Sequence, residues 1–192
     1  MNVEKLKQAE KLFFKAYPGG FDHPEMEQIK KKHKPEKMHQ LAKESFGKEN
    51  FKKIDEVIAN MVKIISRSSM VSVFEKPKFK EFAVSLSHSD KKIIVNGLED
   101  LLHGDQELGF NAMLGILEKA KLAKWTLMTI IPVYYYPKKE VYVKPTTVRG
   151  VIDFYEIENL VYKPKPTFEF YKKYRTIINE MKKQVDKSLG LD

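Results

Sequence analysis

The sequence NFKKIDEVIANMVKII, residues 50–65, has the clearest helical pattern in the chain. Its apolar side chains recur three or four residues apart, so they fall on one face of a helix. These side chains are Phe51, Ile54, Val57, Ile58, Met61, Val62 and Ile65. An unbroken apolar face of this length has to be covered by other elements. We therefore expect a helix here that packs into a sizeable core.

Weaker helical patterns lie on both sides of this segment. Pro18, Gly19 and Gly20 end the first predicted helix, and Asp22 or His23 can cap a second one that starts at Pro24. With these breaks, the pattern predicts helices over residues 3–16, from 24, and over 35–46, 77–86, 89–102, 105–124, 147–155 and 167–187. The chain is therefore expected to be mainly helical.

The pattern changes after residue 124. Residues 125–136 are aromatic and β-branched and include Pro132, so their periodicity fits a helix, a strand or an extended core segment equally well. Residues 140–144 alternate like a short strand that Pro145 would stop. The expected fold class is mainly α, or α+β with a minor β element, in which a short strand or hairpin lies near residues 125–145.

The length of 192 residues fits one compact multi-helix domain over residues 1–192. If the chain divides at all, the boundary is expected at residues 104–125, where an acidic helical part meets an aromatic, basic part. The composition, 42% hydrophobic and 32% charged, is that of a globular protein.

The composition also excludes several classes of site. The chain has no cysteine, which excludes a disulfide framework, a thiolate zinc site and a cysteine nucleophile, and which fits a reducing cytoplasm. The N-terminus is charged from Glu4 onward, and the longest apolar run is too short to span a bilayer. We therefore expect a cytoplasmic protein without a membrane contact.

The net charge is strongly positive, with 35 Lys and Arg against 26 Asp and Glu, or +9. A surplus of this size allows contact with nucleic acid or another polyanion. The only arginines are Arg67, Arg149 and Arg175, and sequence-specific readers of DNA favour arginine, so such a reader is not expected. A solvated, lysine-rich surface without a polyanion partner is the alternative interpretation.

The most suggestive local arrangement follows the expected strand. A lysine at a strand end, followed by hydroxyl side chains that open a helix, can hold an anion between a cation and free backbone N–H groups. The candidate anion or nucleic-acid contacts are Lys144, Thr146, Thr147, Arg149, Lys163 and Lys165. A capped helix after an edge strand, with no ligand, explains the same residues.

Aromatic residues gather in the same part of the chain, between Tyr134 and Tyr174, and are interleaved with lysines. Bases can stack on exposed tyrosines in a basic groove, whereas tyrosines at helical spacing usually belong to the core. An enzyme with a pocket built from Trp125, Tyr135 and Tyr142, and with acids at Asp153 or Glu156, is a further alternative.

Familiar catalytic and metal-binding motifs are missing from the sequence. There is no G-x-S-x-G or S-x-x-K motif and no P-loop, so whether the protein is an enzyme stays open. His33 and His39 lack the i, i+4 spacing of a helical zinc site. We expect neither a metal nor a cofactor.

Several motifs together resemble an uncharacterised family of bacterial cytoplasmic proteins. Residues 17–24, YPGGFDHP, are similar to the F-P-G-G-F-x-x-P start of that family, and Trp125-x-x-x-Thr129-x-x-Pro132 with Val143-Lys144-Pro145 is similar to its W-x-x-x-T-x-x-P and V-K-P segments. This chain departs from the pattern at Thr126, where a proline usually follows the tryptophan. The resemblance implies a bacterial cytoplasmic protein and no particular activity.

These observations lead to one expected function and two alternatives. We expect a non-enzymatic binding or interaction protein whose basic C-terminal surface contacts nucleic acid or another anion. The alternatives are an enzyme of unrecognised class with its pocket near Trp125 and Tyr142, and a module that assembles as a homo-oligomer.

Overall fold

The structure is a computed structural model that describes residues 1–190, and it is mainly helical. Two 3-10 turns, η1 and η2, supplement the α-helices. The elements are α1 (Val3–Ala16), η1 (Gly20–Asp22), α2 (Pro24–His33), α3 (Pro35–Ser45), η2 (Lys48–Lys52), α4 (Ile54–Arg67), α5 (Glu75–Ser85), α6 (His88–His103), α7 (Gln106–Lys119), α8 (Trp125–Tyr135), α9 (Pro145–Phe154) and α10 (Phe168–Gln184).

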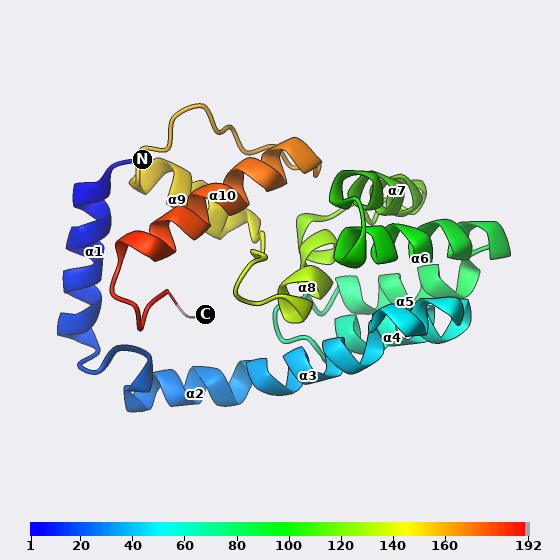
Figure 1. The fold of residues 1–192 in the computed structure, drawn as a ribbon, viewed down its shortest axis with the longest axis horizontal. Coiled ribbons are helices and arrows are strands. Elements are labelled where there is room, and N and C mark those ends of the chain that lie inside the picture. The colour runs from blue at the N-terminus through cyan, green and yellow to red at the C-terminus, as the bar shows by residue number, and fades with distance from the viewer. Residues whose placement is uncertain (191–192) are drawn as a thin grey trace.

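The helices gather at two ends of an elongated molecule (Figure 1). Helices α4 to α7 lie together at one end, with α8 beside them, and α1, α9 and α10 lie at the other. Helices α2 and α3 run along one edge between the two ends, and α3 packs against α8 and α4. The first helix is tied back to the end of α9, because the Asn2 amide donates to the Tyr155 carbonyl at 2.7 Å.

The apolar stripe of residues 50–65 is confirmed as the centre of the core. Val57, Met61, Ile64 and Ile65 of α4 are at most 1% exposed. Phe51 is also buried, but it lies in η2, and the α-helix begins only at Ile54. The stripe therefore joins two elements and faces one common core.

Several predicted helix starts are confirmed by their capping contacts. His23 caps α2 by accepting a hydrogen bond from the Glu25 amide on Nδ1 at 3.3 Å, and Pro24 is the first residue of that helix. Thr167 caps α10 through the Phe170 amide at 3.4 Å. The cap of α6 is Ser87, two residues earlier than the sequence predicts.

The predicted strand or hairpin near residues 125–145 is wrong, because residues 125–135 form α8 and no strand occurs within residues 1–190. Nearly every residue of α8 is buried. A helix that is buried on all sides has no polar face, so its sequence shows no helical period. Pro132 lies within the helix, and its carbonyl accepts a hydrogen bond from the Tyr136 amide at 2.8 Å.

Residues 141–144 form neither a helix nor a strand. Side chains bind their backbone N–H groups instead: the Val143 amide donates to Thr129 Oγ1 at 3.1 Å, and the Val141 amide donates to the Tyr171 hydroxyl at 3.5 Å. The segment therefore crosses α8 and α10 without forming a sheet. An alternating pattern predicts an extended backbone, and it cannot show whether a partner strand exists.

Phe110, within the region of residues 104–125, belongs to an aromatic core that several helices share. The Phe110 ring of α7 lies 6.4 Å from the Trp125 ring, 5.7 Å from that of Phe168 and 5.8 Å from that of Tyr171. These contacts join α7 to α8 and to α10.

No helix within residues 1–190 is long and apolar enough to cross a membrane.

Candidate anion-binding site

A groove of about 640 Å³ lies where the α4–α5 connection meets the first residues of α8 and α9. Lys144 and Thr146, two of the predicted anion contacts, line it together with Trp125 from the predicted aromatic pocket. Other polar lining residues are Ser69, Ser72, Glu75, Lys124 and Thr126. The groove therefore contains residues from two separate predictions, the anion site and the aromatic pocket.

The N-terminus of α9 forms one wall of this groove. Lys144 has an extended backbone at the N-cap position, Pro145 is the first helical residue, and no side chain caps the helix. The helix therefore begins two residues before the predicted start at residue 147, because Pro145 fixes a helical φ, and neither Thr146 nor Thr147 caps it. The first amides of an uncapped helix carry partial positive charge and lack intrahelical acceptors.

Two lysines make this wall cationic. Lys124 and Lys144 have no ion-pair partner among residues 1–190, and both line the groove. Arg149 lies beside them: its Nε donates to the Pro145 carbonyl at 3.3 Å, and its guanidinium lies 5.5 Å from the centre of the Tyr162 ring, which also lines the groove. The arrangement can attract an anion to the start of α9.

One acid opposes these cations. The Glu75 carboxylate lines the groove, and its two oxygens, 3.0 and 3.1 Å from Thr126 Oγ1, share the hydrogen that this hydroxyl donates. Sequence reasoning did not connect Glu75 with this site, because the two residues are fifty-one positions apart. Lys124 and Glu75 could only have been found from the tertiary packing.

The remaining predicted anion contacts lie outside the groove. Lys165 pairs with Glu118 at 2.7 Å. The Lys163 carbonyl accepts a hydrogen bond from the Trp125 indole at 2.8 Å, and Lys163, whose side chain is exposed, lines a separate, smaller cavity of about 270 Å³. Thr147 is exposed on α9 but does not line the groove.

The three predicted pocket aromatics do not share one cavity. Trp125 is 2% exposed. Tyr142 donates its hydroxyl hydrogen to the Met70 carbonyl at 2.7 Å, and burial raises the pKa of that hydroxyl. Tyr135 lies elsewhere, with Lys43 Nζ 4.0 Å from the centre of its ring and the His103 ring 5.3 Å away.

The acids of the enzyme hypothesis are also separate from the groove. Neither Asp153 nor Glu156 lines it. Glu156 accepts a hydrogen bond from Lys5 Nζ at 2.6 Å and another from Asn2, and these contacts hold its pKa below the usual range. That carboxylate fastens α1 to the end of α9. The two acids therefore do not share the groove with Trp125.

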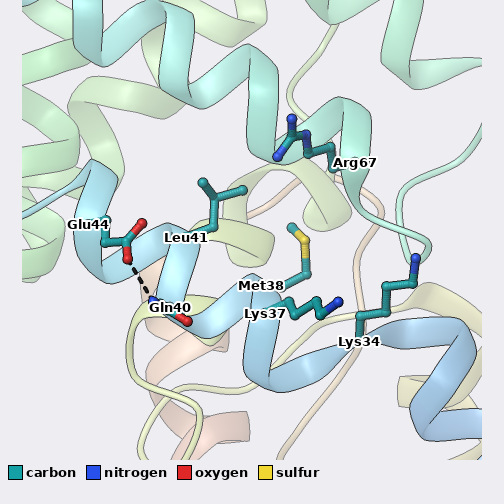
Figure 2. A pocket seen from close by; sticks show the side chains of 7 residues that line it. All are labelled: Lys34, Lys37, Met38, Gln40, Leu41, Glu44 and Arg67. Carbon is teal, nitrogen blue, oxygen red and sulfur yellow. Dashed lines mark hydrogen bonds between the residues drawn. The ribbon is translucent and has the colours of Figure 1, made fainter.

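A second cavity, of about 600 Å³, lies between α3 and the end of α4 (Figure 2). Lys34, Lys37 and Arg67 line it together with Met38 and Leu41. The sequence predicted no site here, because Arg67 is thirty residues away from Lys37 and the two meet only in the fold.

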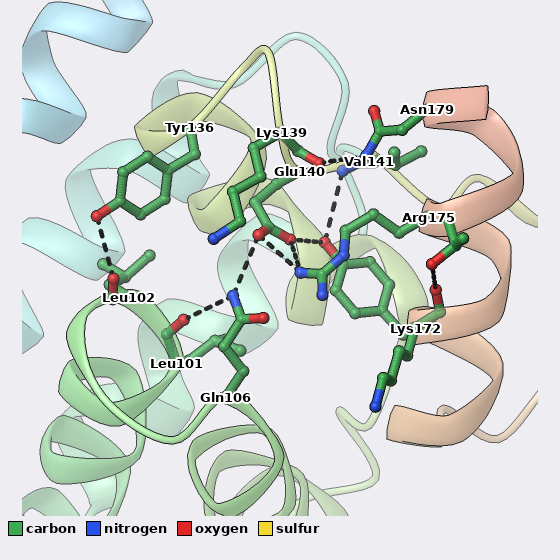
Figure 3. Close-up of polar contacts among 12 residues, drawn as sticks. Leu101, Leu102, Gln106, Tyr136, Lys139, Glu140, Val141, Lys172, Arg175 and Asn179 are labelled. Carbon is green, nitrogen blue, oxygen red and sulfur yellow. Dashed lines mark hydrogen bonds and ion pairs between the residues drawn. The ribbon is translucent and has the colours of Figure 1, made fainter. Parts of the chain in front are cut away.

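A buried ionic cluster holds α10 against the rest of the protein (Figure 3). Both oxygens of the Glu140 carboxylate lie 2.7 Å from Arg175 Nη1; the Tyr171 hydroxyl donates to it at 2.6 Å and Gln106 Nε2 at 3.1 Å. Burial, followed by the Glu140 charge, raises the pKa of Tyr171 well above its ordinary value. The sequence placed Glu140 only at the start of a strand and gave no sign of this cluster.

No group of three or more His, Cys, Asp or Glu side chains that could hold a metal occurs in the part of the chain that the structure describes.

Comparison with known proteins adds no assignment: no family model, no curated protein and no solved structure matches this chain. The function therefore has to be inferred from the geometry of the site.

Proposed function

We propose that this chain is a non-enzymatic binding protein whose groove at the start of α9 holds a polyanion, and that single-stranded nucleic acid fits best. The observation that supports this most is the pairing of an uncapped helix N-terminus with two unpaired lysines in one groove. Lys124, Lys144 and the adjacent Arg149 would each contact one phosphate.

Ion pairs offset several cations of the C-terminal third outside the groove. On α10 and the segment before it, Arg175 pairs with Glu140, Lys165 with Glu118, Lys173 with Glu169 and Lys183 with Glu180. Lys124 and Lys144 have no such pair within residues 1–190, although the Glu75 carboxylate lines the same groove. Two lysines in one groove therefore stay available to a phosphate.

An exposed aromatic residue that is next in sequence to two lining residues favours a single strand. Phe74 is 76% exposed and lies between Val73 and Glu75, both of which line the groove. Bases of a single strand can stack on such a ring, whereas the bases of a duplex are already stacked on each other. Phe74 would therefore supply base contact while the cations supply phosphate contact.

Binding of a fluorescein-labelled oligothymidylate, followed by fluorescence anisotropy, tests this proposal. Three phosphate contacts predict that log affinity falls against log salt with a slope of about −2, or roughly twentyfold between about 50 and 200 mM salt. Lys144→Gln should weaken binding and reduce that slope by about 0.7, and Phe74→Ala should weaken binding without changing the slope.

Lys165→Gln is the matched control, because it removes the same charge from a lysine that pairs with Glu118 outside the groove. Its binding should stay close to that of the unmodified protein. Affinity that does not respond to salt, or an equal loss in Lys144→Gln and Lys165→Gln, would contradict the proposed groove.

A further inference from the structure

We infer that the second cavity, between α3 and the end of α4, is a binding site for a phosphomonoester with an apolar organic part. Lys34, Lys37 and Arg67 supply the cations, and Met38 and Leu41 supply the apolar wall. This site is distinct from the groove at α9, and the inference does not depend on the polyanion proposal.

The three cations of this cavity have no anionic partner within residues 1–190. Arg175 is ion-paired and Arg149 is held by the Pro145 carbonyl and the Tyr162 ring, whereas the Arg67 side chain has no hydrogen bond, ion pair or ring contact within residues 1–190. The side chains of Lys34 and Lys37 likewise have none there; their backbones belong to the helical hydrogen bonds of α2 and α3. A planar guanidinium favours the forked binding of a phosphate, which leaves Arg67 available for that contact.

The net charge of the cavity matches a phosphomonoester. Glu44 is the one acid that lines it, and its Oε1 accepts a hydrogen bond from Gln40 Nε2 at 2.8 Å, within α3. Three cations and one carboxylate leave a surplus of two positive charges. A phosphomonoester carries between about −1.5 and −2 near neutral pH. Glu36 lines an adjoining cavity and not this one.

The shape of the cavity favours an ester over a bare phosphate ion. In Figure 2 the Met38 side chain lies between Arg67 on one side and Lys37 on the other. A volume of about 600 Å³ is far larger than a phosphate ion needs and is ordinary for a small-molecule site. The organic part of the ester would cover Met38 and Leu41 while its phosphate meets the cations.

Titration calorimetry of the full chain with phenyl phosphate tests the inference, with phenol as the ligand that lacks the phosphate. Phenyl phosphate should bind saturably and phenol should not. Arg67→Gln should weaken binding by about tenfold or more, since it removes a charged, forked contact, and Lys34→Gln should weaken it as well. Both side chains are exposed, so both variants should keep the fold.

Lys63→Gln is the control, because Lys63 is an exposed cation on the same helix, does not line the cavity and has no ion pair within residues 1–190. It should change the affinity by less than about twofold.

A free small molecule and the end of a nucleic-acid strand offer the same phosphate group. Trithymidylates with and without a 5′-phosphate, titrated beside phenyl phosphate, distinguish these sources.

Phosphate-dependent binding that Arg67→Gln reduces and Lys63→Gln does not would support the site. Tighter binding of the phosphorylated trithymidylate would then identify a strand end as the source, and tighter binding of phenyl phosphate a free small molecule. Failure of both phosphorylated ligands to saturate, or an equal loss in Arg67→Gln and Lys63→Gln, would overturn the inference. Lys144→Gln, in the groove at α9, should leave phenyl phosphate binding unchanged.

Discussion

The carboxylate of Glu140 is the most constrained charge in the protein, because its side chain is 1% exposed and that of Arg175 is 13% exposed. The attraction between the two charges roughly offsets the free-energy cost of removing both groups from water, so the intact pair adds little net stability. Loss of one partner is different, since it leaves a charge in a poorly hydrated place.

Glu140→Gln should therefore lower the free energy of unfolding by about 3–5 kcal/mol, since Arg175 is left without its counter-charge. Urea unfolding followed by the fluorescence of Trp125, the only tryptophan, measures this. Replacement of both Glu140 and Arg175 by glutamine should recover part of the loss. Lys173→Gln, which breaks an exposed pair on the same helix, should leave the unfolding curve nearly unchanged. Equal effects of Glu140→Gln and Lys173→Gln would contradict the structural role of the buried pair.

Single residues show where sequence reasoning reached the site and where it stopped. Lys144, Thr146 and Trp125 were selected from local patterns, because a lysine before a helix start and an aromatic run are visible within a few positions. Glu75 and Arg67 were not assigned to sites, since each meets its neighbours only through packing between distant segments. A sequence shows which chemical groups lie within a few positions of each other. It does not show which distant segments come into contact in the fold.

Helices α6 and α7 pack more closely than any other pair in the fold. The approach is possible because Gly97 and Gly109 face each other: a Cβ on Gly109 would overlap the Gly97 carbonyl and the Leu101 amide. The partner glycine in α7 could be found only once the packing was known.

Gly109→Ala should therefore destabilise the protein by about 1–3 kcal/mol, since the two helices have to move apart. Gly115→Ala tests the same exchange on the same helix, where a Cβ would meet nothing within 4 Å. That variant should be more stable by up to about 1 kcal/mol, because alanine favours a helix. Thermal unfolding by circular dichroism compares the two. Shifts of the same sign would contradict the described contact between α6 and α7.

Elements with one buried face were predictable, and elements buried on all sides were not. The stripes of α3, α4 and α10 lie between polar positions, so their period is visible in the sequence. Helix α8 is buried almost throughout, so the sequence pattern of residues 125–135 fits a helix, a strand and an extended chain equally well. The pattern predicts a strand over residues 140–144, but side-chain hydroxyls accept the hydrogen bonds of the Val141 and Val143 amides that a neighbouring strand would accept.

For the molecule as a whole, the net charge of +9 does not make every part of the surface equally attractive to anions, because carboxylates offset some of the cations. Exposed carboxylates pair with two lysines of α10, Lys173 and Lys183, while cations at the start of α9 and at the junction of α2 with α3 have no such partner within residues 1–190. The composition predicted a polyanion-compatible surface in the C-terminal third. We propose one groove in that third as the contact, and the inferred phosphomonoester site is a cationic cavity outside it.

Nuclear magnetic resonance of isotope-labelled protein, titrated with a 5′-hydroxyl oligothymidylate, tests the central proposal most directly. Such a strand offers phosphodiesters to the groove but no phosphomonoester to the second cavity. We expect the largest shifts at the amides of Ser72, Lys124, Thr146 and Thr147 and at the Trp125 indole, which borders the groove. Shifts confined to other surfaces, or no shifts at low salt, would contradict a polyanion site at the start of α9.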